Sequence, residues 1–122
     1  MTKVIFDTSF LMAVADRPTN WFDDISEEVG KLEPVALDCV LNELARLSSG
    51  RGKRSKTAAV AVEIAKGFTR LQCGAARPDE EIMSVAITVN AAVATADLEL
   101  ARSLMARRVT VFGLRSGRVV RL

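Results

Sequence analysis

The chain has 122 residues, of which 49% are apolar and 26% are charged, and this composition predicts one domain over residues 1–122 with its own hydrophobic core. Its formal net charge of +2 is too small to indicate a nucleic-acid-binding protein by itself. Histidine and tyrosine are both absent, which excludes Ser-His-Asp and Cys-His catalysis and histidine metal sites. Any chemistry must therefore depend on carboxylates, lysine, hydroxyls or thiols.

The two cysteines, Cys39 and Cys73, do not form a C-x-x-C pair. This spacing argues against a zinc site, and we expect both residues to be reduced, buried and apolar in character, in a cytoplasmic protein. No apolar run approaches the length of a membrane span, and the N-terminus lacks the organisation of a signal peptide. We therefore expect no membrane segment and no membrane partner.

Apolar runs and amphipathic segments alternate along the chain and predict strands and helices in turn. The predicted strands lie at 3–7, 34–38, 69–73, 91–95 and 109–113. The predicted helices lie at 9–16, 20–31, 39–48, 54–67, 79–90 and 97–107. This alternation predicts an α/β fold, a three-layer α/β/α sandwich with a central parallel sheet of about five strands.

An acidic residue, Asp7, follows the first predicted strand in the opening run KVIFDTSFLM. It stands between the apolar residues of that strand and the start of the next helix. Ligands of α/β folds bind at the carboxyl ends of the parallel strands, so this position favours a functional role. Aspartate is also a preferred helix N-cap, and the sequence leaves both interpretations of Asp7 open.

Three further acids lie beside apolar helix faces. Glu43, in DCVLNELARL, borders the apolar stripe of its helix, although a single glutamate on a helix is more often solvated. Asp79 shares the apolar face of a helix that begins after Pro78, whereas Glu81 points elsewhere. Asp97 heads the apolar stripe in VATADLELARSL. A stabilising role at a helix start is the alternative for Asp79 and Asp97.

The four acids can converge at the carboxyl edge of one parallel sheet. Like charges at such short range would repel and destabilise the fold unless a cation intervened. A cluster of oxygen ligands without histidine or cysteine suits Mg²⁺ or Mn²⁺. Ions of this kind activate water and stabilise the leaving oxygen in phosphodiester hydrolysis, and the pattern therefore predicts that reaction.

Four segments, VIFDTSFLM, VLNELARL, PDEEIMSVAI and VATADLELARSL, resemble in their order and spacing the motifs of a PIN domain. The resemblance covers essentially the whole chain. It implies a parallel sheet of about five strands and a cleft of acids that binds Mg²⁺ or Mn²⁺ and cuts RNA. The long run after the last acid is more similar to the stand-alone archaeal and ribosome-biogenesis branch of the family than to VapC-type toxins.

The resemblance also assigns the site residue by residue. Asp7 corresponds to the first acid, Glu43 to the second and Asp97 to the fourth. The third acid corresponds to Asp79 or Glu80, and the helix face favours Asp79. The predicted catalytic acids are therefore Asp7, Glu43, Asp79 and Asp97, and the candidate metal ligands are these four together with Glu80. The hydroxyls that the family keeps beside the metal correspond to Thr8, Ser9 and Thr95.

A basic loop, SSGRGKRSKT, joins two predicted helices. Because an acidic cleft needs positive charge elsewhere to bind a polyanion, we expect phosphate contacts from this loop, with a solvated surface loop as the alternative. The residues concerned are Arg51, Lys53, Arg54 and Lys56. For the adjacent aromatic pair Trp21 and Phe22, a hydrophobic staple or a contact in a homodimer is favoured over stacking on bases.

The sequence thus predicts a cytoplasmic, Mg²⁺- or Mn²⁺-dependent endoribonuclease that acts in RNA processing. Two alternatives stay open, namely a PIN-fold module that binds RNA or protein without cutting it, and a VapC-type toxin ribonuclease of a toxin–antitoxin pair. The partners that these readings imply are RNA, a second copy of the chain, an antitoxin or a ribosome-assembly protein.

Overall fold

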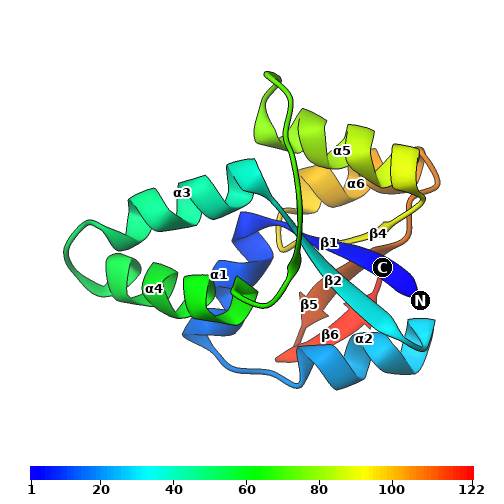
Figure 1. Cartoon of the computed structure of the whole chain (residues 1–122). Helices are drawn as coiled ribbons and strands as arrows, with labels where there is room; N and C mark the ends of the chain where they lie inside the picture. The colour runs from blue at the N-terminus through cyan, green and yellow to red at the C-terminus, as the bar shows by residue number, and fades with distance from the viewer.

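The computed structural model describes all 122 residues, and strands alternate with helices along the chain (Figure 1). The strands are β1 (Thr2–Phe6), β2 (Leu32–Leu37), β3 (Thr69–Leu71), β4 (Ala92–Ala94), β5 (Val111–Arg115) and β6 (Arg118–Arg121). The helices are α1 (Thr8–Asp16), α2 (Trp21–Val29), α3 (Asp38–Ser48), α4 (Lys53–Ala65), α5 (Pro78–Val89) and α6 (Leu98–Ala106). None of these helices is long and apolar enough to cross a membrane.

The six strands form one sheet in the order β3-β2-β1-β4-β5-β6. The first five strands are parallel, and β6 pairs antiparallel with β5. The chain moves from β1 outward to β2 and β3, and then returns to place β4 on the other side of β1. The carboxyl ends of β1 and β4 therefore flank the switch point of the sheet, where α/β folds bind their ligands.

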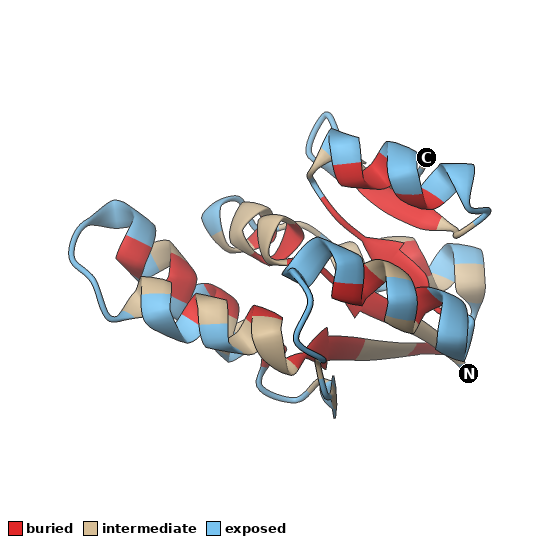
Figure 2. Cartoon of the chain, turned by 90° about the horizontal axis from the view of Figure 1, so that it is seen from above, coloured by how far each residue is buried: buried red, intermediate tan, exposed pale blue.

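Helices cover the sheet in the arrangement that right-handed crossovers dictate. In Figure 1, α5 and α6 lie together on one side of the sheet and α2 on the other, while the α3–α4 hairpin extends beyond the carboxyl ends of the strands. Figure 2 shows that the buried residues face inward between helices and sheet and that the tip of this hairpin is exposed. The three-layer α/β/α prediction is thus confirmed.

The core is centred on β1, which is covered on both faces. Val4, Ile5 and Phe6 are fully buried, as expected for a central strand of a parallel sheet. The Phe6 ring packs edge-on against Trp21, with the centroids 5.2 Å apart. Trp21 therefore belongs to the edge of the core and is not a free base-stacking residue, whereas its neighbour Phe22 is half exposed.

The last strand, β6, was missing from the sequence prediction, which expected about five strands. It is joined to β5 by a tight turn in which Ser116 and Gly117 both have positive φ, 53° and 77°. Two consecutive residues of this conformation form the turn that best matches the twist of a β-hairpin. The Ser-Gly pair is a known turn signal, so this hairpin was recognisable in the sequence.

The helices α5 and α6 both end in a left-handed residue, Asn90 with φ 55° and Arg108 with φ 61°. At the end of α6, the Arg108 N–H donates to Met105 O at 2.9 Å and the Val109 N–H donates to Leu104 O at 3.0 Å. Glycine usually occupies the left-handed position of this motif. A residue with a Cβ costs about 1 kcal/mol or more there, so the position of Arg108 is strained.

Cys39 and Cys73 form a disulfide, and the expectation of two free thiols was wrong. The register of two neighbouring parallel strands explains the pairing. Leu37 at the end of β2 lies opposite Leu71 at the end of β3, and each cysteine follows two residues later. Their Cα atoms are 5.9 Å apart although 34 positions separate them in the sequence, which is an ordinary distance for a disulfide.

Candidate active site

The four predicted acids line one cavity at the carboxyl edge of the sheet, which we call the acid cavity. Its volume is about 380 Å³. The acids come from four different places in the chain, namely the end of β1, the middle of α3, the first turn of α5 and the residue before α6. The lining residues are Asp7, Thr8, Ser9, Met12, Glu43, Arg54, Asp79 and Asp97.

Asp7 is held by hydroxyl groups and does not cap α1 with its side chain. Only 7% of its surface is exposed, and its Oδ2 accepts hydrogen bonds from Ser9 Oγ at 2.6 Å and Thr95 Oγ1 at 2.8 Å. Both hydroxyl oxygens in turn accept backbone N–H groups, Ser9 from Ala96 at 3.0 Å and Thr95 from Asp97 at 3.0 Å. This network fixes one oxygen of Asp7 and leaves Oδ1 without such a partner.

Asp97 does cap its helix, as the alternative interpretation of the sequence held. Its Oδ1 accepts the backbone N–H groups of Glu99 at 2.9 Å and Leu100 at 3.1 Å. The cap uses Oδ1 and leaves Oδ2 without such a partner, and Asp97 still lines the acid cavity. A structural role and a place in the acid cavity are therefore compatible for this residue.

The pKa of Asp79 is raised by its burial and by the neighbouring acids. Burial raises the pKa of its carboxyl above the ordinary value of 3.8, and the charges of Asp7 and Asp97 raise it further. Glu43 adds a smaller contribution in the same direction, while the Arg77 guanidinium lowers this pKa. Asp79 is therefore close enough to the other three acids for their charges to disfavour its ionised form.

The two glutamates after Asp79 have different surroundings. Glu80 lines an adjoining groove between α5 and α6, together with Asp79 and Asp97, but does not line the acid cavity. Glu81 is buried, and its Oε1 accepts the backbone N–H of Ala76 at 3.0 Å. It thereby fastens the segment between β3 and α5, a role that the sequence analysis missed because the partner is a backbone group.

The basic segment reaches the acid cavity through one residue, Arg54. Lys53 and Arg54 also line a neighbouring shallow cavity beside α1, whereas Arg51 and Lys56 are exposed and line neither cavity. The helix α4 begins at Lys53, one residue before the predicted start at 54, so three of the four basic residues belong to the start of this helix. Cations in the first turn of a helix oppose its dipole, so the stability of α4 does not explain them.

The residues present fit a hard divalent cation, although no three acidic side chains stand close enough in this structure to hold an ion as they are. The donors are carboxylates and hydroxyls, which Mg²⁺ and Mn²⁺ prefer. No lysine or arginine neutralises the four acids by an ion pair. The Thr8 hydroxyl, which lines the cavity, is buried without a hydrogen-bond partner, as expected where a hydrated ligand completes a site.

These features define a parallel α/β domain with an acid-lined crevice at its switch point. The family described as PIN like domain matches residues 4–117, and the chain therefore belongs to the PIN-like domain family. The resemblance inferred from the motifs is confirmed. No curated protein gives a significant match by sequence.

Solved structures support the same conclusion. The PIN domain endonuclease Utp24 is 27% identical, with a TM-score of 0.78 over 98% of this chain and 92% of that one. VapBC2 from Rickettsia felis, bound to a promoter DNA fragment, is 14% identical with a TM-score of 0.68 over 92% and 98%. A domain from Methanocaldococcus jannaschii is 15% identical with a TM-score of 0.64 over 95% and 93%. The last two share the fold, and the family includes nucleases.

Proposed function

We propose that the protein is a divalent-metal-dependent endoribonuclease that hydrolyses RNA phosphodiester bonds at the acid cavity and acts in RNA processing. The observation that carries the proposal is the convergence of Asp7, Glu43, Asp79 and Asp97 without any ion pair to neutralise them. Their mutual repulsion destabilises the fold, so the arrangement is best explained by a cation that binds there. The likeness to the endonuclease Utp24 points in the same direction.

Each side chain has a distinct part in this proposal. When bound, Mg²⁺ or Mn²⁺ supplies an activated water and stabilises the leaving oxygen. Asp7, whose Oδ2 is fixed by Ser9 and Thr95, would hold the ion through its other oxygen, and Asp97 would use the oxygen that its cap leaves free. Glu43 and Asp79, which line the same cavity, would complete the ligand set, and Glu80 lies beside it in the adjoining groove.

Arg54 has the only guanidinium that lines the acid cavity. A phosphodiester is itself an anion, and four carboxylates repel it until cations intervene. We therefore assign Arg54 and its neighbour Lys53 to contacts with substrate phosphate. Arg51 and Lys56 belong to the same exposed basic segment and reinforce its field at longer range.

Cleavage of single-stranded RNA tests the proposal. The wild type is incubated with a fluorescent oligonucleotide in Mn²⁺, in Mg²⁺ and in EDTA, beside Asp7→Asn and the matched control Asp23→Asn on the exposed face of α2. We expect metal-dependent internal cleavage that Asp7→Asn lowers by more than about 100-fold, the upper range for residues that only support a metal ligand. Asparagine still accepts both hydroxyl bonds and removes one of the repelling charges, so the melting temperature in EDTA should stay the same or rise.

Three results would contradict the proposal in whole or in part. Tight RNA binding with no cleavage in either metal would favour a module that binds without cutting. An Asp7→Asn variant that is fully active but less stable would make Asp7 a structural residue. Cleavage of a single RNA species in cells, relieved by a co-expressed antitoxin, would favour the toxin alternative over a processing role.

A further inference from the structure

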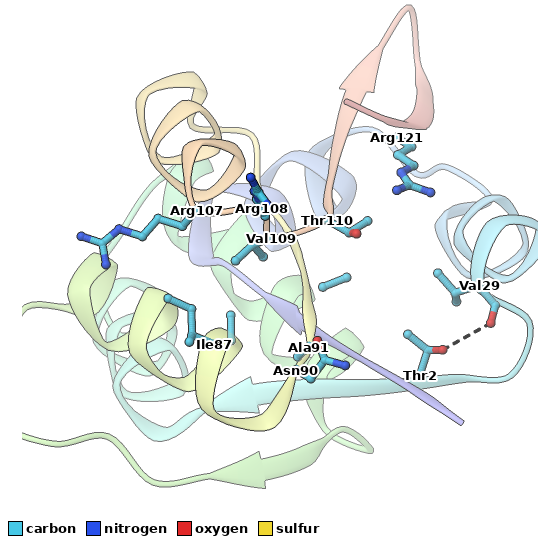
Figure 3. Close-up of a pocket in the computed structure, with 12 residues that line it drawn as sticks. Thr2, Val29, Ile87, Asn90, Ala91, Arg107, Arg108, Val109, Thr110 and Arg121 are labelled. Carbon is cyan, nitrogen blue, oxygen red and sulfur yellow. Dashed lines mark hydrogen bonds between the residues drawn. The ribbon is translucent and has the colours of Figure 1, made fainter.

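A second cavity, of about 360 Å³, lies at the opposite edge of the sheet, and we call it the arginine cavity (Figure 3). The amino-terminal ends of β1, β4 and β5 meet there with the carboxyl-terminal ends of α2, α5 and α6. Arg108 and Arg121 flank the cavity from opposite sides, and Arg107 extends from its rim toward α5. Asn90 and Thr110 add an amide and a hydroxyl to the lining, and no carboxylate takes part.

The positive charge of this cavity is not balanced within the chain. The ion pairs of the structure are Lys3–Glu33 and Lys66–Glu63, and neither involves an arginine. Guanidinium groups that share a cavity repel one another, and their fork of donors suits phosphate or carboxylate oxygens. The arginine cavity is therefore ready to accept an anion from outside the chain.

The backbone of Arg108 is a second and independent indication. Its φ of 61° places it in the left-handed conformation that glycine adopts more easily. The end of α6 would thus be more stable with glycine, so the helix itself does not explain an arginine there. Strain of this kind at a ligand-facing residue is typical of functional sites.

The groove between α5 and α6 shares Asp79 and Asp97 with the acid cavity, and the far ends of the same two helices line the arginine cavity. Near the acid cavity the groove begins at Asp97, and Met83 and Ser103 line it on α5 and α6. One helical turn further, Ile87 follows Met83 and Arg107 follows Ser103, and both line the arginine cavity. The ten positions from Asp97 to Arg107 correspond to about 15 Å along a helix axis, a distance that a stacked strand covers in about four or five nucleotides.

We propose that the arginine cavity binds backbone phosphates of single-stranded RNA that leaves the acid cavity along the groove between α5 and α6. The inference rests on the proposed function, because it gives the same substrate a second contact point. RNA is favoured over an acidic protein segment because the groove leads directly from the acids. The four carboxylates repel phosphates, so binding of a longer strand depends on cationic surfaces, and the arginine cavity adds to the contacts assigned to Lys53 and Arg54.

The test measures RNA binding in an Asp7→Asn background, in which the strand stays intact. A dodecanucleotide and a trinucleotide are titrated by fluorescence anisotropy at several salt concentrations against Arg108→Gly, Arg121→Gln and the control Arg102→Gln, an exposed α6 residue outside both cavities. We expect Arg108→Gly and Arg121→Gln each to weaken dodecanucleotide binding several-fold and to lower the salt slope by about 0.7. Trinucleotide binding should not change, and Arg108→Gly should melt at a higher temperature.

Three outcomes would overturn the inference. The first is an equal loss of affinity in Arg102→Gln, which would indicate only a general positive field. The second is an equal loss of affinity for the trinucleotide. The third is binding of an oligoglutamate peptide that is as tight as RNA binding and requires Arg108, which would assign the cavity to an acidic protein. Absence of cleavage by the wild type in Mn²⁺ would contradict only the proposed function. The binding titration would still show whether the arginine cavity binds RNA, because it does not depend on cleavage.

Discussion

The two edges of the sheet carry opposite charge and are built in different ways. At the carboxyl edge, Asp7 is fixed by hydroxyls and Asp97 by backbone N–H groups. At the amino edge, Arg108 and Arg121 are exposed and make no ion pair. The carboxyl edge therefore holds its charges in a defined geometry, as a reaction requires. The amino edge offers mobile charges, which suit sequence-independent contacts with phosphates.

The edges also differ in covalent support. The Cys39–Cys73 disulfide joins the first turn of α3, which carries Glu43 one turn later, to the segment that leads to Asp79. Glu81 fastens the same segment by accepting the Ala76 N–H. The arginine cavity has no disulfide, and a single side-chain hydrogen bond joins two of its lining residues, from Thr2 Oγ1 to Val29 O at 3.3 Å. The comparison teaches that the site with several repelling acids is the one that the fold holds in place.

The largest expected effect comes from the disulfide. Replacing both cysteines in Cys39→Ser/Cys73→Ser should lower the free energy of unfolding by about 3–4 kcal/mol, because the cross-link closes a loop of 34 residues in the unfolded chain. Urea unfolding of the oxidised wild type, the reduced wild type and the variant measures it. Cleavage should fall as well, while salt-dependent RNA binding at the arginine cavity should persist. Equal stability in all three samples would show that the cross-link is not needed.

Divalent ions should stabilise the protein through the acid cavity and not through the arginine cavity. At a free concentration about a hundredfold above the dissociation constant, Mn²⁺ or Mg²⁺ should add about 2.7 kcal/mol to the free energy of unfolding. The double variant Asp7→Asn/Asp97→Asn should not respond, whereas Arg108→Gly should respond like the wild type. Thermal unfolding in EDTA and in metal measures the difference. A wild type that does not respond at millimolar ion would argue against a metal at the acid cavity.

The basic segment beside the acid cavity should affect binding more than turnover. The variant Lys53→Glu/Arg54→Glu removes two proposed phosphate contacts and should lower the slope of log affinity against log salt by about 1.4, since each contact contributes about 0.7. Cleavage at saturating RNA should change less than affinity. The matched control is Arg46→Glu/Arg70→Glu, which reverses two exposed charges that line neither cavity beside the basic segment. An unchanged salt slope would show that the basic segment is a solvated connection without phosphate contacts.

The smallest expected effect is the pH dependence of Asp79. Because burial and the neighbouring acids raise its pKa in the folded state above 3.8, the folded chain binds this proton more tightly than the unfolded chain does. That contribution to stability is present at low pH and is lost as pH rises through the folded pKa. In EDTA, Asp79→Asn should therefore gain stability relative to the wild type as pH rises toward neutral, and Asp23→Asn should not. Urea midpoints across pH measure it, and a constant difference would contradict the shift.

The order of elements was predictable because strand and helix signals are local. The runs around Val4 and Val93 are apolar without alternation, as strands buried on both faces require. The position of the acids followed from the same signals, since Asp7 and Asp97 stand where a strand gives way to a helix. The strand β6 was not predicted because its only local signal is the turn that precedes it. That turn is formed by Ser116 and Gly117, both with positive φ.

By itself, the sequence determined the α/β layers, the family and the set of acids, because these depend on periodicity and on residue types at element ends. Only the tertiary structure decided which acid is held by hydroxyls and which caps a helix, since Ser9 and Thr95 are 86 positions apart. It also decided the disulfide, which follows from the pairing of β2 with β3, and the arginine cavity, which Arg108 and Arg121 flank from opposite sides. Contacts between distant segments are fixed by packing and register, which no local pattern encodes.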